Sequence, residues 1–192
     1  MRRHHGVSAA LLLLVSGAYA QAPADSRGVE QFGAWKAHHD TLAFERYLAE
    51  QGLAEVAPLY QLLRSASDWQ RCAAEPFALP PEALWPSAGR TLSLLKALRE
   101  DGVIGRFEVV SAYRAPALNR CAGGSANSAH TWAYAVDLWL EQPAPALCEF
   151  WKAHGQRWQM GLSRYPSGRI HIDTAGYRTW GEDYTRGSAF CR

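Results

Sequence analysis

The sequence predicts an α+β domain in which a small, mainly antiparallel sheet has helices packed on one side. Residues 29–104 place apolar side chains at three- and four-residue intervals, which is typical of amphipathic helices. Residues 105–184 contain short β-rich runs in which apolar and polar side chains alternate. Because the helices come first and the strands are interleaved with short helices, a regular βαβ repeat is not expected.

The first twenty residues have the three parts of a secretory signal peptide. Arg2 and Arg3 form a basic start, residues 9–15 form an apolar run, and residues 18–20 (AYA) form a cleavage site. The apolar run is far shorter than the ~20 residues that a membrane-spanning helix needs. We therefore expect an exported protein, periplasmic or secreted, whose mature chain has no transmembrane segment. An uncleaved anchor is the alternative.

The mature chain is expected to be one neutral domain. Removal of Arg2 and Arg3 lowers the 20 Lys and Arg residues to 18, which equals the 18 Asp and Glu residues. Without a clustered positive stripe, nothing indicates a nucleic-acid partner. Residues 21–28 are small and polar and predict a flexible leader. Residues 29–192 then form a single domain, with a mainly helical part over 29–104, and we expect a monomer.

Four cysteines predict two disulfides. An even count in an exported chain favours pairing, and no two cysteines have the C-x-x-C spacing of a zinc or redox site. Three pairings are possible. We favour Cys72–Cys121 with Cys148–Cys191, the second of which would tie down the C-terminus; the spacing alone does not decide between them.

The elements follow in order along the chain. The pattern predicts a first helix from about residue 29 to a stop at Gly52, a second near 54–65 and a third over 90–99 that ends at Asp101-Gly102. Four prolines make residues 72–89 a loop with a short turn. The remaining elements are strands near 107–113, 135–140, 159–164 and 169–173, and a helix around 147–155.

Three residues of types that bind zinc lie in the strand-rich part: His130, Asp137 and His171. Seven positions separate His130 from Asp137, which is ~10 Å along a helix or ~23 Å along a strand. Neither distance lets both residues hold one ion, so the chain must bend between them. The alternative is that both histidines are ordinary packed or surface residues and that Asp137 caps a turn.

Strand alternation favours a shared pocket. Val136, Leu138 and Leu140 fall on one face of the predicted strand and Asp137 on the other. Ile170 and Ile172 likewise fall opposite His171 and Asp173. Two neighbouring strands would then aim Asp137 and His171 at one point. A buried carboxylate needs a cation or hydrogen bonds to offset its desolvation, and a metal would supply that.

Four motifs occur in order: S-x-Y-R-x-P-x-L-N from Ser111, Gly123-Gly124, S-x-H-x-x-x-x-x-x-D from Ser128, and H-I-D-T-x-G-x-R-x-W from His171. Over about residues 105–184 they resemble the zinc D-Ala-D-Ala carboxypeptidase and endopeptidase family of cell-wall enzymes; the N-terminal helices show no such match. That family shares a fold with the Hedgehog signalling domain. The resemblance implies a Hedgehog/DD-peptidase-like fold and zinc ligands at His130, Asp137 and His171.

The chain departs from the family pattern beside the last ligand. Many relatives have an acid three residues before it, as the general base, where this chain has Gly168, and Arg169 stands where some have a second His. Asp173 is the nearest substitute. It could instead hydrogen-bond a ligand His or hold Arg178. Glu182 and Asp183 are weaker candidates. A milder departure is Ala133, where many relatives have Gly.

Four further residues are candidates for the cleft. The resemblance implies that Arg114 clamps a substrate carboxylate or the transition state, a role suited to a planar charged fork; a structural salt bridge is the alternative. Ser128 would bind substrate or fix its loop. Tyr113 and Trp132 would line the cleft or pack in the core.

The leading hypothesis is an exported zinc peptidase that hydrolyses peptidoglycan peptides, as a D-Ala carboxypeptidase or an endopeptidase. Zinc would activate water, Asp173 would take its proton, and Arg114 would stabilise developing charge. The missing acid at Gly168 motivates the second hypothesis, a non-catalytic zinc module that binds cell-wall peptides. A disulfide-stapled protein without metal is the third.

Overall fold

The structure is a computed structural model that describes residues 27–142, 144–181 and 183–191. The predicted signal peptide, most of the predicted leader and Glu182 lie outside the described residues. An α+β architecture with a mainly antiparallel sheet is confirmed. In the part of the chain that is described, no helix is long and apolar enough to cross a membrane.

The sheet has five strands in the order β1-β2-β4-β3-β5. Their bounds are β1 Phe107–Ser111, β2 Ala135–Leu140, β3 Gly161–Arg164, β4 Ile170–Asp173 and β5 Arg178–Trp180. Neighbouring strands are antiparallel except β3 and β5, which are parallel. Strands β2 and β4 therefore lie side by side inside the sheet, where both edges of each strand are paired.

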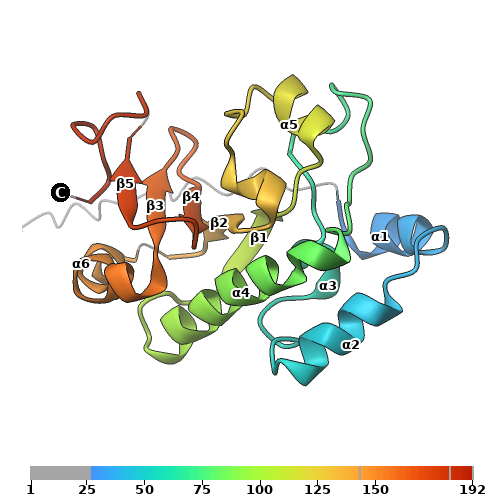
Figure 1. Cartoon of the computed structure of the whole chain (residues 1–192), viewed down its shortest axis with the longest axis horizontal. Coiled ribbons are helices and arrows are strands. Elements are labelled where there is room, and N and C mark those ends of the chain that lie inside the picture. The colour runs from blue at the N-terminus through green and yellow to red at the C-terminus, as the bar shows by residue number, and fades with distance from the viewer. Residues whose placement is uncertain (1–26, 143, 182, 192) are drawn as a thin grey trace, which may run out of the picture.

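The described residues also form six α-helices, which pack around the sheet mainly on one side (Figure 1). Their bounds are α1 Val29–Lys36, α2 Leu42–Glu50, α3 Leu59–Leu62, α4 Trp85–Glu100, α5 Pro116–Cys121 and α6 Ala146–Trp158, with short 3-10 turns at Glu82–Leu84 and Ala129–Trp132. Figure 1 shows α4 and α6 on one side of the sheet, and α5 with the loop after it on the other. The predicted one-sided packing holds for the long helices.

The face of the sheet toward α4 and α6 is apolar. Val136, Leu138, Ile170 and Ile172 all belong to the main hydrophobic core, as the alternation predicted. Leucines of α4 and the aromatic residues Phe150 and Trp151 of α6 complete it. Because successive side chains of a strand point to opposite faces, burial of these residues turns their neighbours Asp137 and His171 to the other face.

The predicted first helix is two helices, because the chain turns between Lys36 and Leu42. The Asp40 carboxylate accepts a hydrogen bond from the backbone N–H of Leu42 at 2.9 Å, and the Thr41 hydroxyl donates to Glu45 at 2.6 Å. Such side-chain bonds at the start of a helix compete with continuation of the preceding one. Gly52, at φ 65°, then ends α2 as expected.

Other differences concern short elements. Helix α4 begins at Trp85 rather than near residue 90, since Pro86 occupies its first turn, where proline is tolerated. Arg27, in the predicted leader, is buried and donates to the carbonyls of Ser65 and Val110 at 2.7 and 2.6 Å. The last residues of the predicted leader are therefore part of the folded domain.

Two disulfides close the loops of the domain. They join Cys72 to Cys121 and Cys148 to Cys191, so the favoured pairing is confirmed. Cys121 is the last residue of α5, and Cys148 lies in the first turn of α6. Disulfides of this kind are typical of exported proteins.

Replacement of Cys72 and Cys121 by serine should lower the free energy of unfolding by about 2–4 kcal/mol, because the bridge closes a loop of 49 residues in the unfolded chain. Denaturant unfolding monitored by circular dichroism would measure this. The matched double variant is Cys148→Ser with Cys191→Ser. The bridge that it removes closes a loop of 43 residues, so the free energy of unfolding should fall by a similar amount. An unchanged midpoint for both would show that the bridges do not stabilise the fold.

Candidate metal centre

Three buried residues from separate elements meet on the polar face of the sheet. His130 lies on the 3-10 turn Ala129–Trp132, Asp137 on β2 and His171 on β4. In the antiparallel register of β2 with β4, Asp137 pairs directly with His171. The bend after His130 is made by Ala133, whose φ of 56° is left-handed. Glycine adopts that conformation at least cost, so the alanine here is tolerated with some backbone strain.

The three candidate ligand atoms have the spacing that one ion requires. His130 Nε2 lies 3.2 Å from Asp137 Oδ1 and 3.3 Å from His171 Nδ1. His171 Nδ1 lies 3.0 Å from the same Asp137 oxygen. Tetrahedral ligands at about 2.0–2.1 Å from zinc are about 3.3–3.4 Å from one another. The group could therefore hold a metal ion with little adjustment.

In each imidazole, the ring nitrogen that faces away from the centre makes a hydrogen bond to the protein. His130 Nδ1 lies 2.6 Å from the carbonyl oxygen of Ala112, to which it donates. His171 Nε2 lies 2.9 Å from Asp173 Oδ2. Each ring thus keeps its second nitrogen for the centre, and this is the arrangement that orients histidine ligands in metal sites. Without a cation or proton, the two inward lone pairs would face each other.

The charges around Asp137 keep it ionised. Burial alone would raise its pKa, but His130 and Arg114 hold the pKa of this carboxyl well below its usual range. Arg114 bonds Asp137 Oδ2 through Nη2 and the Ser111 hydroxyl through Nε, at 2.9 Å to the hydroxyl. Oδ1 therefore faces the imidazoles while Oδ2 faces the guanidinium.

The pKa values of the two histidines are shifted in opposite directions. Burial, with the nearby Arg114 charge, lowers the pKa of His130 to about 4, so its ring is neutral and able to bind a metal. Burial also opposes protonation of His171, but hydrogen bonds to Asp137 and Asp173 raise its pKa above the ordinary value. A proton and a metal ion compete for His171 Nδ1, so metal binding at this centre weakens as pH falls.

Asp173 lies behind His171. It is fully buried, and it accepts hydrogen bonds from Arg178 at 2.7 and 2.9 Å and from the Ala175 N–H at 2.8 Å, besides the bond from His171 Nε2. Gly161 on β3 leaves the space for this carboxylate, since a Cβ there would come within 2.2 Å of Asp173 Oδ2. Both contacts named as alternatives to a base role, the ligand histidine and Arg178, are present.

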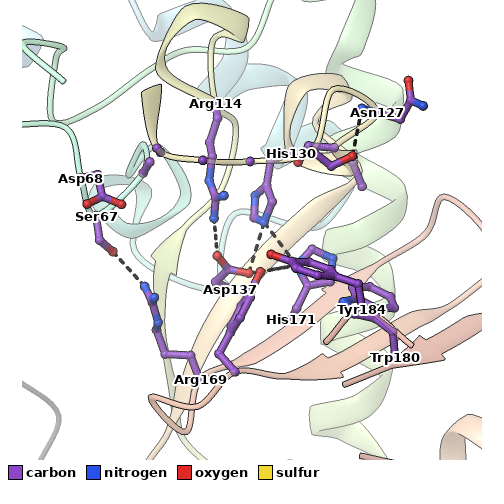
Figure 2. Close-up of a pocket in the computed structure, with 18 of the residues that line it drawn as sticks. Ser67, Asp68, Arg114, Asn127, His130, Asp137, Arg169, His171, Trp180 and Tyr184 are labelled. Atoms are coloured by element: carbon purple, nitrogen blue, oxygen red, sulfur yellow. Dashed lines mark hydrogen bonds and ion pairs between the residues drawn. The ribbon is translucent and has the colours of Figure 1, made fainter. Parts of the chain in front are cut away.

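A cavity of about 600 Å³ opens above the centre, with His130, Asp137 and His171 in its lining. Figure 2 shows Arg114 pointing toward Asp137 and the histidines, with Trp180 and Tyr184 to one side and Arg169 to the other. Arg114 and Ser128, two of the sequence candidates, line the cavity. The centre is therefore buried against the core and adjoins this cavity.

Other sequence candidates lie elsewhere. Tyr113 lies beyond the end of β1, outside the cavity lining; it contributes to a small separate pocket with Phe44 and Leu92. Trp132 is 58% exposed and also absent from the lining. Asp183, a weaker candidate for the base, accepts hydrogen bonds from Thr185 and Ser188. The structure does not bring these three residues to the cavity.

Gly168 occupies a hairpin turn between β3 and β4. Its φ is 88°, a conformation in which any other residue would be strained, and a Cβ there would contact the Trp139 ring at 3.7 Å. The position three before the last ligand is therefore turned away from the centre, toward Trp139, and is not part of the cavity lining.

Sequence reasoning missed several residues of the cavity wall. The Tyr165 hydroxyl lies 3.3 Å from His171 Nδ1, and the His171 ring packs edge-on against Trp180 at 5.2 Å. Ser67 and Asp68 reach the wall from the segment after α3. Trp180 ends the last of the four motifs, but no periodic or spacing signal marks Tyr165, Ser67 or Asp68, because turns and long-range packing bring them to the site.

A model of the peptidase M15 family matches residues 59–173. That range covers 115 of the 192 residues and includes all three members of the buried group. The chain belongs to the peptidase M15 family. The predicted resemblance to zinc D-Ala-D-Ala carboxypeptidases is therefore confirmed, and this member of a zinc-dependent family has a buried His-Asp-His group that could hold a metal ion. No curated protein and no solved structure gives a significant match.

The extent of the M15 match differs from the expected one. It begins at Leu59, the first residue of α3, so it includes helical residues that showed no resemblance by motif, while α1 and α2 lie outside it. It ends at Asp173, before the R-x-W of the last motif.

His130→Ala and Asp137→Ala should each weaken zinc binding by more than about 100-fold, since loss of a residue that merely orients a ligand already costs about 10–100-fold. Elemental analysis after dialysis and titration with a zinc indicator would measure this. His38→Ala is the matched control, because His38 lies outside the cavity lining. Full zinc retention by both variants would contradict the assignment of the metal ligands.

Proposed function

We propose that this M15 peptidase hydrolyses peptidoglycan peptides, as a D-Ala carboxypeptidase or as an endopeptidase acting on cross-links, and that its metal is zinc. The observation that supports this most is the buried His130–Asp137–His171 group at the floor of a cavity, inside the family match. We propose further that the domain has the fold shared by D-Ala-D-Ala peptidases and the Hedgehog signalling domain. The same proposal places the mature protein in the periplasm or outside the cell.

His130, Asp137 and His171 would hold the zinc, which would supply Lewis acidity and lower the pKa of bound water to about 7. The residues around them keep the ligand atoms in place. The Ala112 carbonyl fixes the His130 ring, and the Asp173 carboxylate fixes the His171 ring. Arg114 holds Asp137 and contributes positive charge close to the reacting carbonyl, which would stabilise developing negative charge.

Asp173 is better suited to positioning than to proton transfer. Its two oxygens accept bonds from His171, Arg178 and Ala175, and it contacts the nitrogen of His171 that points away from the centre. Among the described residues, Asp68 is the one carboxylate besides Asp137 that lines the cavity. Asp68 is therefore the carboxylate to test for the base role.

Asp173→Asn separates the two roles. If Asp173 positions His171, zinc affinity should fall about 10–100-fold, and activity should recover when zinc is saturating. Zinc competition with a chelator and kcat at saturating zinc are the measurements. A loss of kcat of about 100-fold or more with unchanged zinc affinity would assign the base role to Asp173 instead. Asp68→Asn is the comparison variant, for which we expect the loss of kcat together with unchanged zinc affinity.

The reaction itself is tested by digestion of purified muropeptides with zinc-loaded protein. We expect released D-Ala or separated cross-linked dimers by mass spectrometry, loss of products with a chelator and their return with zinc. Asp137→Ala provides the inactive control. Bound but unchanged muropeptides would favour the alternative, a non-catalytic zinc module. Gly168 supports that alternative, because no acid occupies the position of the usual base and this position is turned away from the centre.

A further inference from the structure

The wall of the cavity is much more basic than the chain as a whole. The lining includes four arginines and, among the described residues, only two carboxylates: Arg114, Arg169, Arg178 and Arg186 against Asp68 and Asp137. The chain without residues 1–20 has equal numbers of basic and acidic residues. Positive charge is therefore concentrated where a substrate would lie, and this favours an anionic substrate.

Two of these arginines already hold carboxylates of the protein. Arg114 bonds Asp137, and Arg178 bonds both oxygens of Asp173. Arg114 uses its Nε for Ser111, so only Nη1 of its guanidinium has no partner among the described residues. The charge of Arg114 is therefore already offset by a carboxylate of the protein, as is the charge of Arg178.

Arg169 is held in a defined position without any acidic partner in the described part of the chain. Its Nη1 donates to the Ser67 hydroxyl at 2.9 Å and its Nε to Ser167 at 3.1 Å, and its guanidinium lies 5.5 Å from the centre of the Tyr165 ring. These contacts come from its own hairpin and from a segment 102 residues away. A charged group fixed by neutral partners keeps its charge available for a ligand and loses little entropy on binding.

We propose that Arg169 and Ser67 form a carboxylate-binding subsite of the cavity. The carboxylate that it recognises belongs to the residue that supplies the nitrogen of the scissile amide and is released as the amine. When that residue is C-terminal, this group is the C-terminal carboxylate of the peptide. Arg169 would supply a charge-assisted hydrogen bond and Ser67 its hydroxyl. This inference rests on the proposed peptidase function and names the feature that selects its substrate.

The geometry of the cavity agrees with this assignment. Figure 2 shows Arg169 and Ser67 on the opposite side of Asp137 from Trp180 and Tyr184. A peptide lying across the metal centre would therefore place its carboxylate at Arg169 and its preceding residues against aromatic side chains. The same turn that withdraws Gly168 from the centre leaves Arg169 in the lining.

The test compares an N-acetylated peptide ending in D-Ala-D-Ala with its C-terminal amide. Zinc-loaded wild-type protein should have a kcat/KM for the free acid at least about tenfold above that for the amide, the value of one charge-assisted bond. Arg169→Gln should reduce this ratio to near one, and Ser67→Ala should reduce it in part. Arg106→Gln is the matched control, because Arg106 is exposed, pairs with Glu141 and lies outside this cavity.

Binding of both peptides is measured in parallel by calorimetry on zinc-free protein, so that the result does not depend on turnover. Preference for the acid that Arg169→Gln abolishes supports the subsite even if no peptide is cleaved, in which case the peptidase function fails and the subsite stands. Cleavage with an unchanged acid-to-amide ratio in Arg169→Gln overturns the subsite and leaves the peptidase function intact. Undetectable binding of the free-acid peptide also overturns it. Should Arg169→Gln misfold by circular dichroism, Arg169→Lys replaces it, with a partial loss of the ratio expected.

Discussion

The register of β2 on β4, which sets Asp137 opposite His171, is the constraint on which the site depends. A slip of β4 by one residue would turn His171 and Asp173 into the core and Ile170 and Ile172 out of it, at a cost that excludes it. The apolar pattern that packs the sheet on its helices therefore also fixes the direction of Asp137 and His171. An ionised carboxylate as buried as Asp137 must be compensated, and His130, His171 and Arg114 are the groups that do so. The centre is thus part of the packing of the sheet.

The walls of the cavity need a different kind of support, because loops form them. The Cys72–Cys121 bridge joins the segment that follows Ser67 to the end of α5, from which the glycine-rich part of the wall continues. The Cys148–Cys191 bridge ties the chain beyond Tyr184 to α6. Each disulfide therefore restrains one side of the cavity, while strand pairing holds its floor. This division would let the floor keep Asp137 and His171 in place while the walls determine which ligands fit the cavity.

The sequence was most informative where structure is set by local periodicity. Alternation over residues 135–140 and 169–173 predicted both strands and the direction of the ligands, since the two-residue period is a property of the strand itself. It could not predict β5, which has three residues and is defined by its pairing with β3. Nor could it place Arg27 in the core or Tyr113 outside the cavity, because those positions follow from contacts with segments distant in the chain.

Asp173 shows the limit of such reasoning most clearly. Two residues beyond His171 on a strand, it was expected on the same face, and its side chain does lie beside the His171 ring. The shared strand face does not determine which imidazole nitrogen of His171 the Asp173 carboxylate contacts. Asp173 bonds Nε2, whereas Nδ1 is the nitrogen that faces Asp137 and His130, so the ring stands between this carboxylate and the proposed metal position. The geometry therefore favours a positioning role for Asp173, and the proposal of a general base moves to the wall of the cavity, where Asp68 lies.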